Sequence, residues 1–138
     1  MYRTILGIER LLSDKIGLIR GLRIGLVCNQ ASVIPDTFVH AADAFGECSE
    51  FQLTTLFGPQ HGIRGDVQDN MIETPHTVDE RTGKPVYSLY SETREPTEDM
   101  VKDIDAFVID LQDVGCRIYT FVYTMANCMR AAKQFGKK

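Results

Sequence analysis

The clearest strand in the sequence is Asp105-Ala106-Phe107-Val108-Ile109-Asp110-Leu111-Gln112. Its apolar centre is nearly continuous, which is typical of a parallel strand that is covered on both faces. The strand closes with polar side chains, so Asp110, Gln112 and the following Asp113 are expected at its carboxyl end. In open α/β sheets, ligands bind beyond this end of the strands.

Three further runs predict strands of the same sheet. They are residues 23–29, 51–57 and 85–90, each short and rich in strand-forming side chains. Apolar positions at helical spacing predict helices over residues 5–19, 36–45, 98–104 and 119–135, with Asp36 and Thr97 as N-caps. Residues 66–84 lack a period and contain proline and glycine, so they predict a long loop of the kind that serves as a lid or binding loop.

This alternation of strands and helices predicts an α/β fold, in which helices cover the faces of a mainly parallel sheet. The chain has 138 residues, of which 43% are hydrophobic and 25% are charged. It can therefore bury one ordinary core, and a single domain over residues 1–138 is expected.

Composition and motifs argue against several classes of function. A net charge of -4 and a pI near 5.3 leave no basic stripe for nucleic acid, and no apolar run reaches the length of a membrane span. Neither GxGxxG after the first strand nor GxxxxGK[ST] is present, so nucleotide cofactors lack their usual phosphate cradle. The four cysteines show no CxxC pair or zinc spacing, so no metal or other cofactor is predicted and the thiols are expected to be reduced.

The loop after the 51–57 strand has the most informative composition. The end of this strand and the loop together read Leu56-Phe57-Gly58-Pro59-Gln60-His61-Gly62-Ile63-Arg64-Gly65-Asp66. Glycine and proline specify the backbone path, whereas His61, Arg64 and Asp66 supply a proton carrier, an anion clamp, and a base or its partner. Such a loop either carries function or is a structural turn with a surface ion pair.

Three loops are expected to bring polar groups together at the carboxyl edge of the sheet, because parallel strands end at the same edge. These groups are Asn29 and Gln30 from the first loop, Gln60, His61 and Arg64 from the second, and Asp110, Asp113, Arg117 and Tyr119 from the last.

Four segments, in order and covering nearly the whole chain, carry a resemblance to a known family. They are Arg23-Ile24-Gly25-Leu26-Val27-Cys28-Asn29-Gln30, residues 56–65, residues 85–90 with Arg94-Glu95-Pro96-Thr97, and Asp110-Leu111-Gln112-Asp113-Val114-Gly115-Cys116-Arg117-Ile118-Tyr119-Thr120. They resemble the bacterial family that contains the NamZ-type exo-β-N-acetylmuramidases. The resemblance implies a Rossmann-like N-terminal domain of a two-domain protein, with the active cleft between this domain and a C-terminal domain that is absent from this chain.

The resemblance implies a glycoside hydrolase that removes N-acetylmuramic acid from the non-reducing ends of peptidoglycan fragments. The implied partners are a peptidoglycan-derived amino sugar and the C-terminal domain. This chain has Gln60 where the family more usually has glutamate, and an amide cannot exchange a proton as a carboxyl group does. Gln60 could orient a water or the acetamido group, with Asp113, Asp110 or a residue outside this chain as the acid.

The residues at this edge have expected roles in such a reaction. Candidate catalytic residues are Gln60, His61 and Asp113, and candidate substrate-binding residues are Asn29, Gln30, Arg64, Tyr90, Arg117 and Tyr119. Arg64 or Arg117 would bind the lactyl carboxylate of N-acetylmuramic acid through two hydrogen bonds. Tyr90 and Tyr119 would contact the sugar or are ordinary half-buried aromatics, and His61 is an acid/base group or holds the loop.

Two alternatives to an active glycosidase stay open. Gln60 favours a domain that binds an amino sugar or muropeptide without cleaving it, and a fragment with no activity of its own is the other alternative. Localisation depends on processing: the protein would be periplasmic or secreted if a signal peptide has been removed, and cytoplasmic otherwise.

Overall fold

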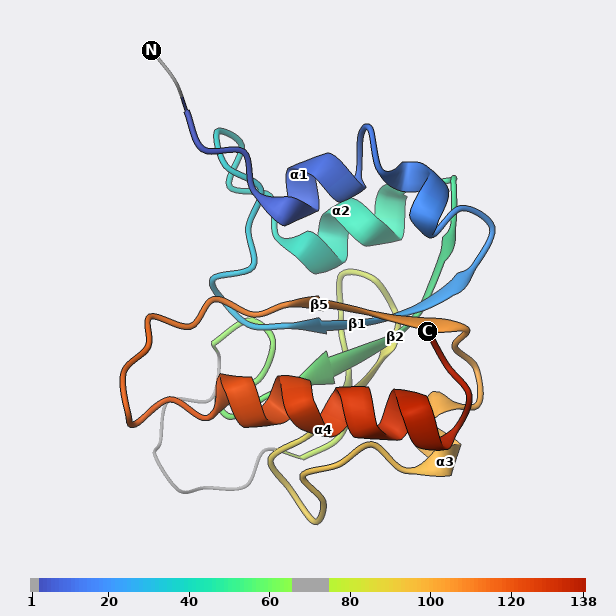
Figure 1. Ribbon diagram of the computed structural model, residues 1–138, viewed down its shortest axis with the longest axis vertical. Helices are drawn as coiled ribbons and strands as arrows, with labels where there is room; N and C mark the ends of the chain where they lie inside the picture. Colours follow the sequence, from blue (N-terminus) through green and yellow to red (C-terminus); the bar gives the residue numbers. More distant parts are fainter. Residues whose placement is uncertain (1–2, 66–74) are drawn as a thin grey trace.

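The computed structural model describes residues 3–65 and 75–138. Within them, five strands form one sheet in the order β3-β4-β2-β1-β5 (Figure 1). The strands are β1 (Arg23–Cys28), β2 (Gln52–Gly58), β3 (Thr77–Val78), β4 (Pro85–Ser88) and β5 (Ala106–Asp110). All neighbouring pairs are parallel except β3 with β4, which confirms the predicted α/β fold with a mainly parallel sheet.

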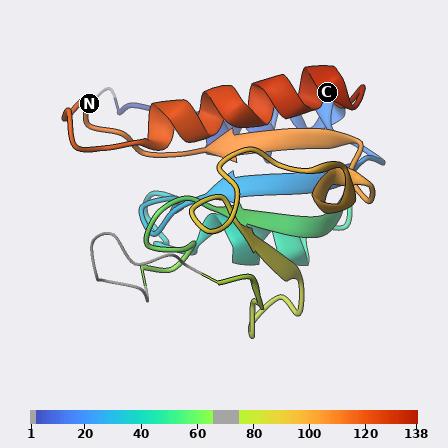
Figure 2. The same ribbon diagram turned by 90° about the horizontal axis from the view of Figure 1, so that it is seen from below.

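Helices cover both faces of this sheet and make three layers (Figures 1 and 2). On one face lie α1 (Gly7–Leu11), the 3-10 helix η1 (Ile16–Leu18) and α2 (Ala41–Glu47), whereas α3 (Glu98–Val101) and α4 (Phe121–Gln134) contribute to the opposite core. Side chains of β1 alternate between these cores: Leu26 packs with the first group and Val27 with the second.

Strand β1 lies inside the sheet, paired with β2 on one side and with the edge strand β5 on the other. Its residue Gly25 is required by close packing, because a Cβ there would lie 2.8 Å from the ring of Phe57 and 2.9 Å from Ile104. The missing side chain lets these two large residues cover the strand. This burial on both faces explains why the sequence of β1 is a continuous apolar run.

Two predicted helices are wrong in extent. Residues 5–19 form α1 and η1 rather than one helix, because Ser13 Oγ donates to the Glu9 carbonyl and the backbone turns between the two elements. The helix expected from Asp36 begins only at Ala41, with His40 as its N-cap. Asp36 has a left-handed φ of 69°, so it lies in a turn and does not cap the helix.

The remaining elements agree with the predictions in position. Strands were expected at the places of β1, β2, β4 and β5, and helices at those of α3 and α4. Thr97 occupies the N-cap position of α3, but its side chain makes no capping hydrogen bond. Residues 66–74 of the predicted long loop lie outside the described residues, and its later part contains β3, which the sequence did not predict.

The packing at Gly25 predicts a loss of stability for Gly25→Ala. The new methyl group would overlap Phe57 and Ile104, so the free energy of unfolding should fall by about 1–3 kcal/mol in urea denaturation. Gly17→Ala is the matched control, because a Cβ at Gly17 meets no atom within 4 Å. Equal stability of the two variants would contradict the packing argument.

Candidate functional site

Strands β1, β2, β4 and β5 run in the same direction, so the loops that follow them meet at one edge of the sheet (Figure 1). The candidate residues predicted from the sequence all lie in these loops. Their side chains nevertheless have different surroundings, and the structure divides them into several groups.

The loop after β2 is shaped by left-handed backbone conformations. His61, Gly62 and Gly65 have φ values of 74°, 73° and 72°, and the Gly62 amide donates to the Pro59 carbonyl over 3.1 Å. A Cβ at Gly65 would lie 3.1 Å from the Cβ of Gln30, so this loop packs directly against the loop after β1. Gln60 and His61 are half-buried on the same turn, whereas Asp66 lies outside the described residues.

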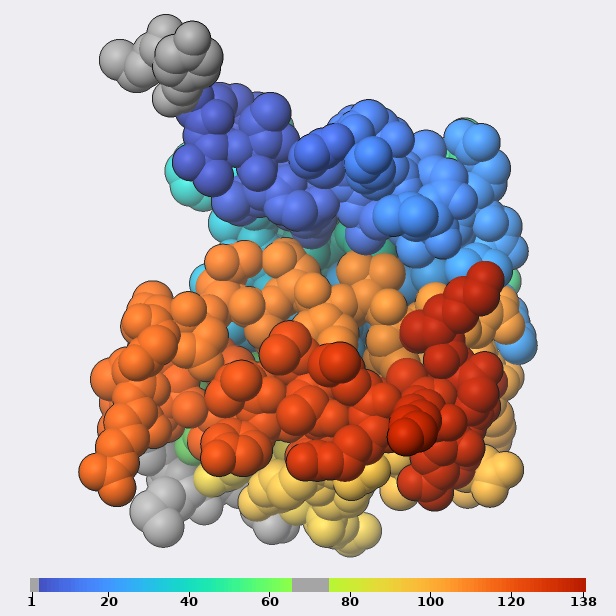
Figure 3. Space-filling model, in the orientation of Figure 1, coloured from blue at the N-terminus to red at the C-terminus, as the bar shows by residue number. Residues whose placement is uncertain are grey.

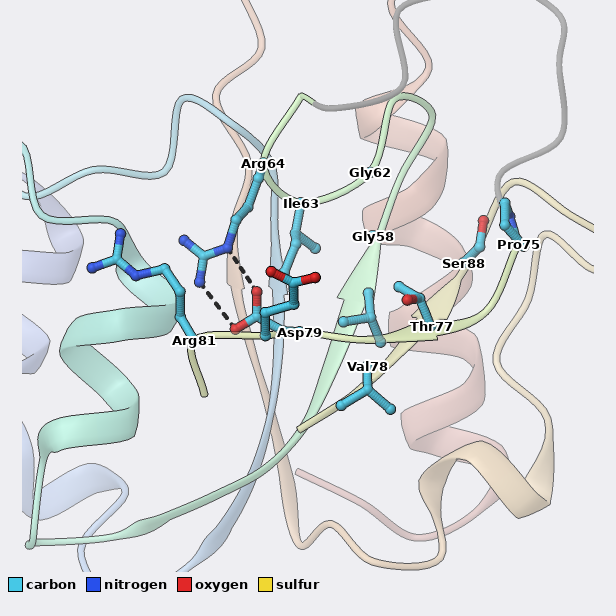
Figure 4. A pocket seen from close by; sticks show the side chains of 12 residues that line it. Gly58, Gly62, Ile63, Arg64, Pro75, Thr77, Val78, Asp79, Arg81 and Ser88 are labelled. Atoms are coloured by element: carbon cyan, nitrogen blue, oxygen red, sulfur yellow. Dashed lines mark hydrogen bonds and ion pairs between the residues drawn. The ribbon is translucent and has the colours of Figure 1, made fainter. Parts of the chain in front are cut away.

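Arg64 is held between two buried carboxylates, those of Asp43 and Asp79, and Figure 4 shows its bonds to Asp79. Its Nε donates to Asp79 Oδ1 and its Nη2 to Asp43 Oδ1, each over 2.7 Å, and a second bond joins Nη2 to Asp79 Oδ2 over 3.0 Å. Arg81 also reaches Asp43, with 3.1 Å between Nη1 and Oδ2. We call Asp43, Arg64 and Asp79 the arginine cluster; it ties the loop after β2 to α2 and to the turn after β3.

The arginine cluster favours the charged forms of its members. Burial tends to raise the pKa of Asp79, but hydrogen bonds from Arg64 and Thr82 outweigh it and lower the pKa to about 2. Hydrogen bonding to Asp79 raises the pKa of Arg64 above its ordinary value. An ion pair at this loop was one of the two predictions, and Arg64 does form ion pairs, but with buried rather than surface carboxylates. These carboxylates occupy the guanidinium that was predicted to bind a carboxylate of the substrate.

Asp43 and Asp79 were missed by the sequence analysis. Asp79 had a usable signal, because an aspartate three residues before Thr82-Gly83 is typical of a turn in which the carboxylate accepts from the backbone. The structure contains this bond, from the Thr82 amide to Asp79 Oδ2 over 2.9 Å. Asp43 had no such signal, since the sequence placed it in the middle of an amphipathic helix.

Asn29 is 1% exposed and joins the loops after β1 and β5. Its Oδ1 accepts from the Ala31 amide over 3.1 Å, and its Nδ2 donates to the Gln112 carbonyl over 3.3 Å. Ser32 Oγ donates to the Asp110 carbonyl and accepts from the Asn29 amide. Asn29 is therefore buried and links the loops after β1 and β5 by hydrogen bonds in this structure. Its contact with a substrate stays a prediction.

Asp110 at the end of β5 has two differently placed oxygens. Oδ1 accepts from Gln112 Nε2 over 3.1 Å, whereas Oδ2 is buried and has no hydrogen-bond partner among the described residues. Burial raises the pKa of this carboxyl group. Of the two aspartates named as possible acids, Asp110 therefore has the environment that favours a protonated carboxyl group.

Asp113, Arg117 and Tyr119 line one cavity of about 570 Å³ between the loop after β5 and the start of α4. Tyr119 stacks on Phe121 with 5.4 Å between ring centroids, which leaves one ring face for other contacts. Asp113 Oδ1 accepts from the Gly115 amide over 2.7 Å. In the described range 75–138, no ion pair joins Asp113 to Arg117.

A second cavity of about 400 Å³ lies between the loop after β2 and the β3–β4 hairpin (Figure 4). It includes Arg64 and Asp79 and shares no lining residue with the cavity beside α4. Tyr90, after β4, lines neither cavity, and the guanidinium of Arg94 lies 4.1 Å from the centroid of its ring. The predicted site residues thus share an edge of the sheet without forming one pocket.

Within residues 3–65 and 75–138, no group of three or more His, Cys, Asp or Glu side chains could hold a metal ion. No helix in this part of the chain is both long and apolar enough to span a membrane. All four cysteines are free thiols, and Cys28 and Cys128 are buried.

The sheet, its helical layers and the polar loops at one edge define an α/β three-layer domain. The model of the family described as exo-β-N-acetylmuramidase NamZ, N-terminal, matches residues 24–138. The chain belongs to this family, as its sequence motifs predicted. It is 47% identical over 130 residues to the peptidoglycan β-N-acetylmuramidase NamZ of Bacillus subtilis (strain 168), a match that covers 94% of this chain and 31% of that protein.

Two crystal structures of DUF1343 family proteins from Bacteroides fragilis NCTC 9343 have the same fold. One superposes with a TM-score of 0.84 at 41% identity, covering 96% of this chain and 32% of the other. The second has a TM-score of 0.79 at 28% identity and covers 99% and 33% of the two chains. This chain therefore spans about a third of the length of the relatives that it matches.

The arginine cluster predicts a dependence of stability on pH. Because the pKa of Asp79 is lowered to about 2, its stabilising effect is complete above the unfolded-state pKa of about 3.9 and is lost as the pH falls toward 2. Asp79→Asn should lower the free energy of unfolding by about 2–3 kcal/mol at pH 7, because one unit of pKa corresponds to about 1.4 kcal/mol. The difference between wild type and variant should shrink between about pH 4 and pH 2.

Glu80→Gln is the control for this prediction. Glu80 is the exposed neighbour of Asp79, so its substitution should change the free energy of unfolding by less than about 0.5 kcal/mol. A pH-independent difference between wild type and Asp79→Asn, measured in urea at several pH values, would show that the carboxylate charge is not what stabilises the loop.

Proposed function

We propose that this chain is the N-terminal domain of a glycosidase that removes N-acetylmuramic acid from the non-reducing ends of peptidoglycan fragments. The observation that carries this proposal is the 47% identity to the Bacillus subtilis peptidoglycan β-N-acetylmuramidase over 94% of the chain. The relatives are about three times as long as this chain. In this proposal, residues outside these 138 complete the active site.

Arg117 is the better of the two candidate arginines for the lactyl carboxylate of the substrate. The guanidinium of Arg64 is engaged by Asp43 and Asp79, and moving it to a substrate would leave two buried carboxylates without their partner. Arg117 is exposed and lines the cavity that also contains Asp113 and Tyr119. A guanidinium can bind a carboxylate there through two parallel hydrogen bonds.

In this proposal, one carboxyl group for hydrolysis comes from the loop after β5. Glycosidases generally use one protonated and one ionised carboxyl group. Asp113 is exposed and lines the same cavity as Arg117. It is the first candidate for a carboxyl group that acts on the substrate. Gln60 orients a water or the acetamido group of the sugar, and His61 acts beside it as an acid/base group or holds the loop.

Binding without cleavage is the second candidate function, and Gln60 favours it. This side chain stands where the resemblance leads us to expect a glutamate, and an amide cannot act as a proton donor to a leaving oxygen. A domain of this kind would hold the amino sugar at the same edge of the sheet without breaking the glycosidic bond.

The first experiment measures free N-acetylmuramic acid released from an N-acetylmuramic acid–N-acetylglucosamine disaccharide by the longer protein that carries this domain. We expect release by wild type and a fall in kcat of at least about 100-fold for Asp113→Asn, with binding retained. Glu92→Gln is the control, as Glu92 is exposed and lines neither cavity. A folded wild type that binds the disaccharide and releases no N-acetylmuramic acid would favour the binding function.

The role of Arg117 is tested by comparing two sugars, one with and one without the lactyl carboxylate. Arg117→Ala should raise the KM for the N-acetylmuramic acid disaccharide by about 10-fold or more, because a charge-assisted bidentate pair is lost. Inhibition by N-acetylglucosamine, which lacks the lactyl carboxylate, should change little. Arg130→Ala on the exposed side of α4 is the matched control, and equal effects on both sugars would exclude a carboxylate contact.

A further inference from the structure

His40 is a buried histidine between the loop after β1 and the start of α2, and the sequence analysis did not single it out. It is 9% exposed. Its Nδ1 accepts from the Ala42 amide over 3.2 Å, which caps α2, and its Nε2 lies 3.0 Å from the Asn29 carbonyl oxygen. A backbone amide only donates and a carbonyl only accepts, so the tautomer with the proton on Nε2 satisfies both contacts.

On the Nε2 side, His40 holds a turn of buried polar groups, residues 29–32, which we call the Asn29–Ser32 turn. The Asn29 carbonyl also accepts from the Ser32 amide over 3.0 Å, and the Asn29 amide donates to Ser32 Oγ over 2.9 Å. The Ser32 carbonyl accepts from the Ala41 amide over 2.8 Å. Asn29 and Ser32 are at most 1% exposed, so a lost bond in this turn would not be replaced by bulk water.

The Asn29–Ser32 turn holds the end of β5. Backbone pairing of β1 with β5 ends at Cys28 and Asp110. Beyond this pair, Ser32 Oγ donates to the Asp110 carbonyl. Asn29 Nδ2 donates to the Gln112 carbonyl over 3.3 Å. Two side chains of the turn therefore satisfy alternate carbonyl groups at the point where the backbone of β1 no longer pairs with this segment.

Asp113 follows directly on a loop with little other support. Residues 112–120 are exposed, and Figure 3 shows the loop after β5 at the surface beside the start of α4. Among residues 3–65 and 75–138, the bond from Asn29 to Gln112 is the one hydrogen bond that ties residues 112–119 to a segment distant in sequence. The position of the Asp113 carboxylate therefore depends on how firmly Asn29 is held.

On the Nδ1 side, His40 fixes the start of the helix that carries Asp43. The Asp43 amide donates to the His40 carbonyl over 3.0 Å, and the Asp43 carboxylate pairs with Arg64 of the loop after β2. One buried side chain thus contacts the supports of two loops at the carboxyl edge of the sheet. His40 itself lines neither the cavity of Arg64 nor the cavity of Asp113.

We propose that His40 is a positioning residue of the glycosidase site, which holds Asn29 and through it the loop that carries Asp113. This inference rests on the proposed function, in which Asp113 acts on the substrate. Its physical basis is that displacement of a reacting group by about 1 Å can cost a factor of about 100 in rate. His40 prevents such a displacement by fixing the Asn29–Ser32 turn from inside the domain.

Two substitutions separate the two bonds of His40. In His40→Asn, the side-chain oxygen takes the place of Nδ1 and keeps the cap, but no atom reaches the Asn29 carbonyl. In His40→Gln, the side-chain nitrogen takes the place of Nε2 and keeps the bond to Asn29, but the cap is lost. In the longer protein that carries this domain, kcat for release of N-acetylmuramic acid should fall at least about 10-fold in His40→Asn and less than about 3-fold in His40→Gln.

The Gly115 amide provides a readout that needs no substrate. It donates to Asp113 Oδ1 over 2.7 Å, so its NMR chemical shift reports the position of that carboxylate. The Gly115 signal of this chain should move in His40→Asn and stay in place in His40→Gln. Ser32→Ala, which breaks the bond to Asp110 without changing His40, should move it as well. His76→Asn is the matched control, because His76 is exposed and asparagine keeps its one acceptor, the atom that binds the Ser88 amide.

The outcomes separate this inference from the proposed function. A wild type that releases no N-acetylmuramic acid would count against the glycosidase, whereas a Gly115 signal that moves in His40→Asn alone of the two His40 variants would still support the positioning of Asp113. An unmoved Gly115 signal in His40→Asn and Ser32→Ala would overturn it. Equal kcat in wild type and His40→Asn would overturn it too, and equal losses in His40→Asn and His40→Gln would mean that His40 supports the fold as a whole.

Discussion

The position of β1 between β2 and β5, buried on both faces, is the constraint on which the rest of the structure depends. Parallel pairing on both sides of β1 fixes the direction of β2 and β5, and burial on both faces requires helices above and below the sheet. Gly25 makes this burial possible by giving room to Phe57 and Ile104. Because three parallel strands then end at one edge, every polar loop of the candidate site lies on the same side of the domain.

Polar groups at this edge serve two physical roles that residue type alone does not separate. Asn29 and the arginine cluster each form their hydrogen bonds and ion pairs inside the domain, and each holds neighbouring loops at fixed positions. Asp113, Arg117 and Tyr119 are exposed around a cavity and have capacity for an external ligand. In a preorganised site the first group gives rigidity to the second, since a loop held by buried charges costs little entropy when a ligand binds.

The cavity beside α4 bears on the glycosidase function proposed from family membership. A glycosidase site needs a cleft that excludes water and two carboxyl groups at a defined separation. In the proposed function, the cavity beside α4 would form one side of such a cleft, and exposed apolar side chains of α4 lie next to it. The relatives that this chain matches are about three times as long as the chain itself.

The sequence by itself determined the α/β class, the places of four strands, the last helix and the family, because apolar runs and motif residues are properties of neighbouring positions. It also named the loop residues that share the carboxyl edge. Tertiary structure alone decided that Asp36 lies in a turn, that the first helix is interrupted, and that Arg64 and Arg117 belong to different cavities. The partners of Arg64 lie 15 and 21 residues away along the chain, and local periodicity carries no information about contacts at such separations.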